Sequence, residues 1–114
     1  MIDKAKLEDY FSQIGTNRIP VYIDLYLSSN KKFITLFDKY IAHGHIEKLT
    51  KLVHKTRGST AVFYDEELNE ILTKIEDNLL QSPLQITDED VSLLKTRFTR
   101  FCQELASLKS YYRN

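Results

Sequence analysis

Apolar side chains recur every three or four residues along most of the chain, which is the spacing of amphipathic α-helices. The pattern predicts five helices, over residues 4–14, 20–42, 46–63, 66–80 and 87–112. The last range has the most regular apolar stripe, formed by Val91, Leu94, Phe98, Phe101, Leu105, Leu108 and Tyr112. We expect a long helix there, packed lengthwise against the others.

Residues that commonly begin or stop helices lie near these boundaries. Asp3, Asp65 and Thr87 are N-cap types, and Asp90, three residues after Thr87, makes a weaker relative of the capping box. Pro20 suits a first helical turn, because the N–H that it lacks would be unpaired there. The predicted stop signals are Gly15, Gly44 and the stretch Gln81-Ser82-Pro83.

The arrangement of the helices follows from their number and their connections. Ser28-Ser29-Asn30 lies inside the second range and could kink or break that helix. Short connections between long helices force neighbours to run antiparallel, and 114 residues fit one domain. We therefore expect an all-α fold for a single domain, 1–114: an antiparallel up-and-down four-helix bundle with a short extra N-terminal helix.

Composition narrows the class of protein. A hydrophobic fraction of 42% and a charged fraction of 28% are typical of a globular domain, and 3 glycines with 2 prolines disfavour a turn-rich all-β fold. The single cysteine, Cys102, excludes an internal disulfide and a Cys-rich zinc site, and we expect it to be a packing residue. His43-Gly44-His45 lacks the further ligands of a zinc motif, so we interpret it as a polar loop and expect no metal and no cofactor.

Charge and hydropathy exclude further classes. The 16 basic and 16 acidic residues give zero formal net charge, which argues against a nucleic-acid partner, because phosphate contacts need a clustered cationic surface. No apolar run approaches the ~20 residues of a membrane span, and the N-terminus lacks the basic-then-apolar pattern of a signal peptide. We therefore expect a cytoplasmic protein with no membrane partner.

One histidine lies on the wrong side of its predicted helix for a core residue. The apolar positions 49, 52, 53, 56, 60 and 63 cluster around one direction at about 100° per residue, and His54 lies roughly 150° from it. Lys51 and Gly58 lie beside His54 on the outward face. We therefore expect an exposed imidazole, which is either a reactive group or a surface histidine without a role.

The neighbours of His54 favour a reactive group. A glycine inside a helix costs about 0.5–1 kcal/mol relative to alanine, and Gly58, one turn on, clears space for something large to reach the ring. Lys51 and Arg57, three residues to either side, can donate hydrogen bonds to an anion held there. A neutral imidazole nitrogen is a nucleophile, and the sequence places no carboxylate partner that would make it a hydrolytic base. These features predict a site that holds a phosphoryl group.

The stretch from His54 to Ser59 resembles the motif His-x-x-Lys-Gly-Ser of the histidine phosphotransfer (HPt) family of antiparallel helical bundles. His54, Gly58 and Ser59 match the motif, and Arg57 stands at its lysine position. Residues 21–44 look like the long family helix before the histidine helix, and residues 68–80 look like the helix after it. Ile14-Gly15 followed by Ile19-Pro20 is similar to the small free-standing relay proteins of quorum-sensing systems.

The resemblance implies a phosphoryl carrier in a two-component phosphorelay, without kinase or hydrolase activity of its own. His54 would accept the phosphoryl group from an aspartyl phosphate on the receiver domain of a hybrid sensor kinase and pass it to that of a response regulator. Arg57 would steady the phosphoryl group, Gly58 would admit the active-site loops of the receiver, and Ser59 would help to fix the helix. Lys51, Lys55 and Ala61 would belong to the partner-binding face of a monomer, and any magnesium would sit in the receiver.

Two departures from the family pattern leave an alternative open. Arginine replaces the usual lysine at position 57, which keeps the charge but changes its geometry. Tyr64 stands where the family has a glycine after the histidine helix, and this replacement could alter the following turn or place an aromatic ring beside the docking face. The alternative is a degenerate HPt-like bundle that binds a receiver or kinase without phosphotransfer. A coiled-coil oligomerisation domain built on the last helix is a third hypothesis.

Other groups have simpler explanations. The acidic run Asp65-Glu66-Glu67 stands at a predicted helix start, where it favours the helix dipole. The pairs Tyr10-Phe11 and Tyr111-Tyr112 near the two ends of the chain stay without an assigned role.

Overall fold

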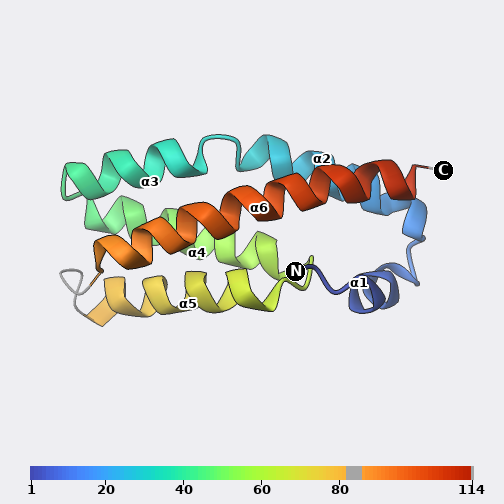
Figure 1. Ribbon diagram of the computed structural model, residues 1–114, viewed down its shortest axis with the longest axis horizontal. Coiled ribbons are helices and arrows are strands. Elements are labelled where there is room, and N and C mark those ends of the chain that lie inside the picture. The colour runs from blue at the N-terminus through green and yellow to red at the C-terminus, as the bar shows by residue number, and fades with distance from the viewer. Residues whose placement is uncertain (82–85, 114) are drawn as a thin grey trace.

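A computed structural model describes residues 1–81 and 86–113, and these residues form an all-helical molecule (Figure 1). The elements in chain order are α1 (Lys4–Phe11), the 3-10 helix η1 (Thr16–Arg18), α2 (Ile19–Ser29), α3 (Phe33–Ala42), α4 (Ile46–Ala61), α5 (Glu66–Gln81) and α6 (Asp88–Tyr112). Extended pairing in the described ranges is limited to an isolated bridge between Ile2 and Asp65. The prediction of an all-α fold is confirmed.

The helices from α2 to α6 extend along the long axis of a molecule that measures 45 × 21 × 21 Å (Figure 1). Helix α4 packs against α3 and α5, and α6 packs against α2 and α5. Helices α2 and α3 follow one another along one long edge, while α1 lies at the end of the molecule where α6 finishes. The result is an elongated helical bundle with α4 exposed along one side.

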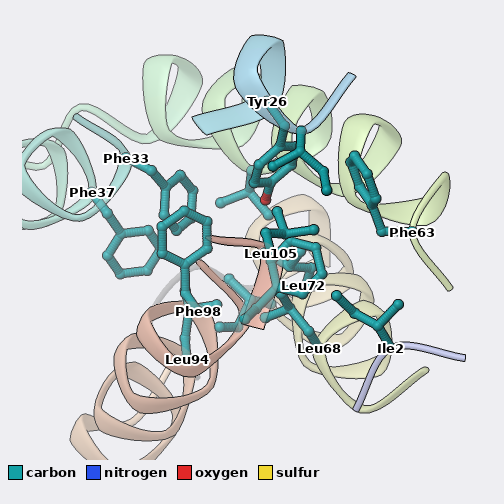
Figure 2. Packing of buried hydrophobic residues seen from close by; sticks show 14 of the residues in the cluster. Ile2, Tyr26, Phe33, Phe37, Phe63, Leu68, Leu72, Leu94, Phe98 and Leu105 are labelled. Atoms are coloured by element: carbon teal, nitrogen blue, oxygen red, sulfur yellow. The ribbon is translucent and has the colours of Figure 1, made fainter. Parts of the chain in front are cut away.

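The core is formed by the apolar stripes of these helices and is rich in aromatic rings. Phe33, Phe37 and Phe98 gather in one part of it (Figure 2). The ring of Tyr26 lies edge-on to Phe101, with 5.3 Å between the ring centroids. The predicted stripe of the last helix is buried from Leu94 to Leu108, at Leu94, Phe98, Phe101, Leu105 and Leu108. A coiled coil built on these positions would therefore have to displace the core of the molecule.

Several predicted helix boundaries are confirmed by the hydrogen bonds found there. Asp3 accepts from the N–H of Lys6, and Thr87 forms a complete capping box with Asp90. The carboxylate of Asp65 accepts from the N–H of Leu68 at 3.1 Å, so it caps α5 as expected. Helix α5 continues to Gln81, and the rest of the predicted stop signal, Ser82 and Pro83, lies outside the described residues.

The first helix is shorter than predicted. Helix α1 ends at Phe11 and not at Ile14, because the chain leaves the helical path in a turn that Gly15 closes. Gly15 has a φ of +101°, which favours glycine, and its N–H donates to the carbonyl of Phe11 at 2.8 Å. The glycine signal therefore marks the end of the turn after α1.

The predicted helix over residues 20–42 is two helices, α2 and α3, with a break after Ser29. Asn30 stands at the break, and its buried side chain donates to the carbonyl of Tyr26 at 3.0 Å. It also accepts from the hydroxyl of Thr56 on α4, at 3.2 Å. The break at Ser28-Ser29-Asn30 thus has a structural role, because the Asn30 amide joins the end of α2 to α4.

Candidate functional site

His54 lies near the middle of α4 and points away from the core, as the helical spacing predicts. Its side chain is 68% exposed, whereas Leu49, Val53, Thr56 and Thr60 of the same helix are buried. The buried positions are three or four residues apart and therefore share one face of the helix, so this face points inward and the imidazole points outward. The ring is accessible to a macromolecule.

The expectation that His54 has no carboxylate partner is wrong. Glu76 of α5 reaches across the helix pair, and its Oε2 atom contacts the Nδ1 atom of His54. Glu76 is only 6% exposed. An ionised carboxylate can only accept a hydrogen bond, so the ring must donate from Nδ1, which leaves Nε2 on the exposed side as the nitrogen with a free lone pair.

The sequence contains a signal for Glu76 in the apolar stripe of its helix. Glu76 follows Leu72 by four residues and precedes Leu79 by three, so it stands within the apolar stripe of its helix. A carboxylate on a buried stripe needs a partner, because an unpaired buried charge is strongly unfavourable. Which residue is that partner depends on how α4 and α5 pack, and the sequence spacing does not contain this information.

Arg57 shares the carboxylate of Glu76 with His54. Its Nε atom lies 2.6 Å from Oε1 of Glu76, close enough for an ion pair although the N–H is not aligned for a hydrogen bond. The Arg57 side chain is 35% exposed. The guanidinium expected to steady an anion is therefore held toward α5 on one side and open to solvent on the other.

The remaining predicted site residues line the outer face of α4. Lys51, Lys55, Gly58 and Ala61 are all exposed, and a side chain added at Gly58 would meet nothing within 4 Å. Lys51 forms a solvent-exposed ion pair with Glu47 at 3.5 Å, so part of its charge is offset. The structure brings these residues onto one surface around the histidine.

Ser59 faces a different direction from His54. Its hydroxyl donates to backbone carbonyls of its own helix, to that of Thr56 at 3.1 Å and to that of Lys55 at 3.3 Å. Such bonds fix the serine side chain on α4 and do not tie the helix to a neighbour. Ser59 was expected to help to fix the histidine helix. The bonds that its hydroxyl makes are all within α4.

A groove of about 230 Å³ runs between α2 and α4 beside this face. Its walls are mainly apolar, with Lys55 and Ser59 on the α4 side and Tyr22, Leu25, Ser29, Asn30, Val62 and Phe63 among the other lining residues. Leu25 is 58% exposed, which is unusual for a leucine next to a core. On α4 the groove is lined by Lys55, the residue next to His54, and by Ser59.

A buried polar network under the site sets the orientation of α4. The hydroxyls of Tyr26 and Thr60 are hydrogen-bonded at 2.7 Å, and Thr60 also donates to the carbonyl of Thr56 at 2.7 Å. Burial raises the pKa of the Tyr26 phenol far above its usual value, so the group stays neutral. Because these groups must stay paired, α4 cannot rotate about its axis, and His54 is kept outward.

Tyr64 adopts a backbone conformation that favours glycine. It has a φ of +57°, within the left-handed region that costs a residue with a side chain about 1–2 kcal/mol. Its ring packs edge-on to Tyr10 of α1, with 6.2 Å between centroids. The tyrosine thus packs against α1 at the end of α4, and the turn into α5 keeps the geometry of a glycine turn.

The histidine pair, the cysteine and the aromatic residues near the two ends of the chain have structural explanations. The rings of His43 and His45 lie 5.8 Å apart at the α3–α4 turn, and no group of three or more metal-ligating side chains occurs within the described residues. Cys102 is half-buried, and burial raises the pKa of its thiol to about 11, so it is a poor nucleophile. Tyr112 donates to Glu8 at 2.7 Å, and the Lys4 ammonium lies 3.8 Å from the ring centre of Tyr111, so the terminal aromatics join α1 to α6.

Comparisons with protein-family models, with curated proteins and with solved structures found no match to this chain. The resemblance to the HPt family therefore rests on the residues described above. Across residues 1–81 and 86–113, the structure has no helix that is both long and apolar enough to span a membrane. The chemistry of the His54 surface is the basis for assigning a function.

Proposed function

We propose that this protein is a histidine phosphotransfer protein of a phosphorelay, with His54 as the residue that carries the phosphoryl group. The observation that supports this best is the contact between His54 Nδ1 and the buried carboxylate of Glu76, on a ring that is 68% exposed. The contact leaves Nε2 as an accessible nucleophile. In this proposal the protein acts as a cytoplasmic monomer.

The transfer step needs one donor, an aspartyl phosphate on a receiver domain. The lone pair of Nε2 attacks phosphorus and forms the N–P bond, while the P–O bond to the aspartyl carboxylate breaks and its oxygen keeps the electron pair. The proton on Nδ1 stays on the ring, next to Glu76. A second receiver reverses the step, taking the phosphoryl group onto its own aspartate and leaving His54 neutral.

The shape of the molecule fits this role if its helices form an antiparallel four-helix bundle. In that arrangement α2 and α3 together make one leg, α4, α5 and α6 make the other three, and α1 covers one end. The left-handed backbone of Tyr64 supports the resemblance, because the position retains the conformation that the family's glycine would favour.

We propose that the receiver docks on the outer face of α4 and the adjoining groove. Gly58 leaves open space in front of the ring, and the apolar groove toward α2 offers surface to be buried. Lys55 at the groove and Lys51 near the ring are exposed cations that complement the acidic site of a phosphorylated receiver. Ala61 extends this face toward the end of α4.

Phosphotransfer can be measured with receiver domains phosphorylated by a small phosphodonor. Wild-type protein is expected to take up acid-labile, alkali-stable label, and His54→Gln is expected to take up none. His43→Gln is the matched control, since it removes another exposed histidine and should label like wild type. Label that persists in His54→Gln would overturn the site assignment, and absence of label with every cognate receiver would overturn the relay.

The non-catalytic alternative has one supporting observation, the engagement of Arg57 by Glu76. A guanidinium held in this way has less freedom to follow a phosphoryl group. The alternative expects a receiver to bind His54→Ala as tightly as it binds wild type, with no transfer in either case. Calorimetric binding measured beside the labelling assay separates the two functions.

A further inference from the structure

We propose that a second groove, which lies between α6 and the break separating α2 from α3, binds a small monocarboxylic acid with an aromatic or short aliphatic body. The residues that line it come from the break, from α3 and from α6, whereas His54 is on α4. The inference therefore does not depend on phosphotransfer at His54.

The break places neighbouring residues against two different helices. The amide of Asn30 accepts a hydrogen bond from Thr56 of α4, whereas Lys31, the next residue, lies at the groove beside α6. The volume of this groove is about 370 Å³, which falls within the ~300–1,000 Å³ of small-molecule sites. We call it the α3–α6 groove, and it is lined by Lys31, Ile34, Phe98, Thr99, Cys102, Gln103 and Ala106.

The apolar part of the α3–α6 groove is held in place by the core. Phe98 is buried, and its ring packs against that of Phe33 with 4.6 Å between the centroids. Ile34 is half-buried beside it and packs against the same core. Cys102 is also half-buried, and burial raises the pKa of its thiol to about 11, so the group stays neutral. A ligand would therefore meet a preformed apolar surface.

Two ion pairs join α6 to the neighbouring helices on either side of the groove. Lys95 pairs with Asp38 of α3 at 2.6 Å, and Lys109 pairs with Asp24 of α2 at 2.5 Å. The α6 residues of the groove, 98 to 106, lie between these two pairs along the helix and span ~12 Å at ~1.5 Å per residue. This length fits a small molecule better than a partner helix of several turns.

The charge of the α3–α6 groove favours an anion. The lysines at its two ends are each neutralised by an aspartate. Lys31 is exposed and forms no ion pair with any residue in 1–81 or 86–113, so one positive charge is left uncompensated at the rim. The Thr99 hydroxyl and the Gln103 amide can donate further hydrogen bonds. One cation beside an apolar surface matches a monocarboxylate with an apolar body.

Two probes of the same shape and different charge test the class of ligand. Phenylacetate and the neutral phenylacetamide are titrated into nitrogen-15-labelled protein, and amide shifts are followed by NMR. We expect shifts centred on Phe98, Cys102 and Ala106, with phenylacetate bound up to about fivefold more tightly than the amide, because an exposed charge pair contributes modestly. Lys31→Met should remove this preference. Lys32→Met is the matched control, since it removes an exposed neighbouring cation that does not line the groove.

Cys102 provides an independent readout, because it is the single cysteine of the chain. Its rate of alkylation by iodoacetamide at alkaline pH should fall when phenylacetate is bound over it. Ala106→Trp fills the groove, and should weaken binding of both probes at least about tenfold, as expected when a ligand loses its apolar contacts. Ser107→Trp is the matched control at the next residue, which is exposed and does not line the groove. Circular dichroism confirms that each variant is folded.

Each outcome decides for or against the site. Preference for the acid that is lost in Lys31→Met and kept in Lys32→Met, together with protection of Cys102, supports it. Absence of shifts at these residues with either probe at millimolar concentration overturns the site, and equal binding of acid and amide overturns the assignment to an anion. Shifts at the same residues that grow with protein concentration alone would show that a second copy covers the groove, and would also overturn the proposal.

Discussion

Glycine at position 58 leaves the surface in front of His54 open at a cost in helix stability. The position is in the interior of α4, it is exposed, and a Cβ there would meet no atom within 4 Å. Nothing in the fold therefore requires glycine. Access to the imidazole is the physical reason that remains.

A pair of substitutions at this residue separates folding from docking. Gly58→Ala and Gly58→Leu should both leave the fold intact and raise its stability by about 0.5–1 kcal/mol, because glycine is the poorest helix former after proline. Only the leucine side chain is long enough to cover the ring, so we expect receiver binding to weaken strongly in Gly58→Leu and little in Gly58→Ala. Thermal unfolding and receiver titration test this. Loss of helical signal in Gly58→Leu would contradict the outward orientation of this position.

The break between α2 and α3 affects the site because its residue Asn30 is bonded to α4, the helix that carries His54. Asn30 pairs with the backbone of α2 through Tyr26 and with α4 through Thr56. The same network continues to Thr60 along the buried side of α4. The break therefore positions the helix on which His54 lies.

Removing the amide should expose this coupling. Asn30→Ala leaves the buried hydroxyl of Thr56 without its acceptor, and we expect it to destabilise the protein by about 1–3 kcal/mol. Thr56→Val should cost less in the Asn30→Ala background than in wild type, because the bond is already lost. Urea unfolding of the four proteins in this cycle measures the coupling energy. Asn17→Ala, at an exposed position, is the control, and additive effects of the two substitutions would contradict the network.

Helix α6 ties the whole molecule together through ion pairs to three other helices. The pairs are Lys74 with Asp90 (3.1 Å), Lys95 with Asp38 (2.6 Å) and Lys109 with Asp24 (2.5 Å). Each lies largely at the surface and is worth about 0–1 kcal/mol. Their value is in specifying which helix lies beside which, since the buried stripes are similar in chemistry.

One of these pairs predicts a dependence of stability on pH. The hydrogen bond from Lys74, followed by the bonds at Thr87, holds the pKa of Asp90 below its usual value, although burial opposes this. A lowered pKa in the folded state means that the contribution to stability is present above the unfolded value of about 4 and is lost as the pH falls through the folded value.

Acid titration of stability tests this assignment. Wild type should be more stable than Asp90→Asn near neutral pH, and the difference should shrink as the pH falls below about 4. Asp88→Asn, in the same first turn of α6, is the control for charge at the helix start. Urea midpoints measured across the acidic range give the difference, and one that does not change with pH would show that Asp90 is not the titrating group.

The sequence was informative wherever a short stretch of chain contains the whole cause. Apolar spacing predicted the all-α fold and the outward position of His54, because helical periodicity is a local property. The capping residues Asp3 and Thr87 act on the backbone within three residues, so their roles were also predictable. The end of α1 was misplaced because a turn lies between Phe11 and Gly15, and spacing does not distinguish a helix from a turn over so few residues.

The partner of His54 was decided by tertiary structure. Glu76 is 22 residues away along the chain, and its carboxylate meets the imidazole because α4 and α5 pack side by side at one rotation about their axes. That rotation is set by packing of the core and by the polar network around Asn30, which join segments far apart in the sequence. Helical spacing was enough to predict an exposed histidine on a helix, one turn before a glycine. The packing of the helices decided that a buried carboxylate contacts the ring. A charge on an apolar stripe needs a partner, but the stripe does not show which residue that partner is.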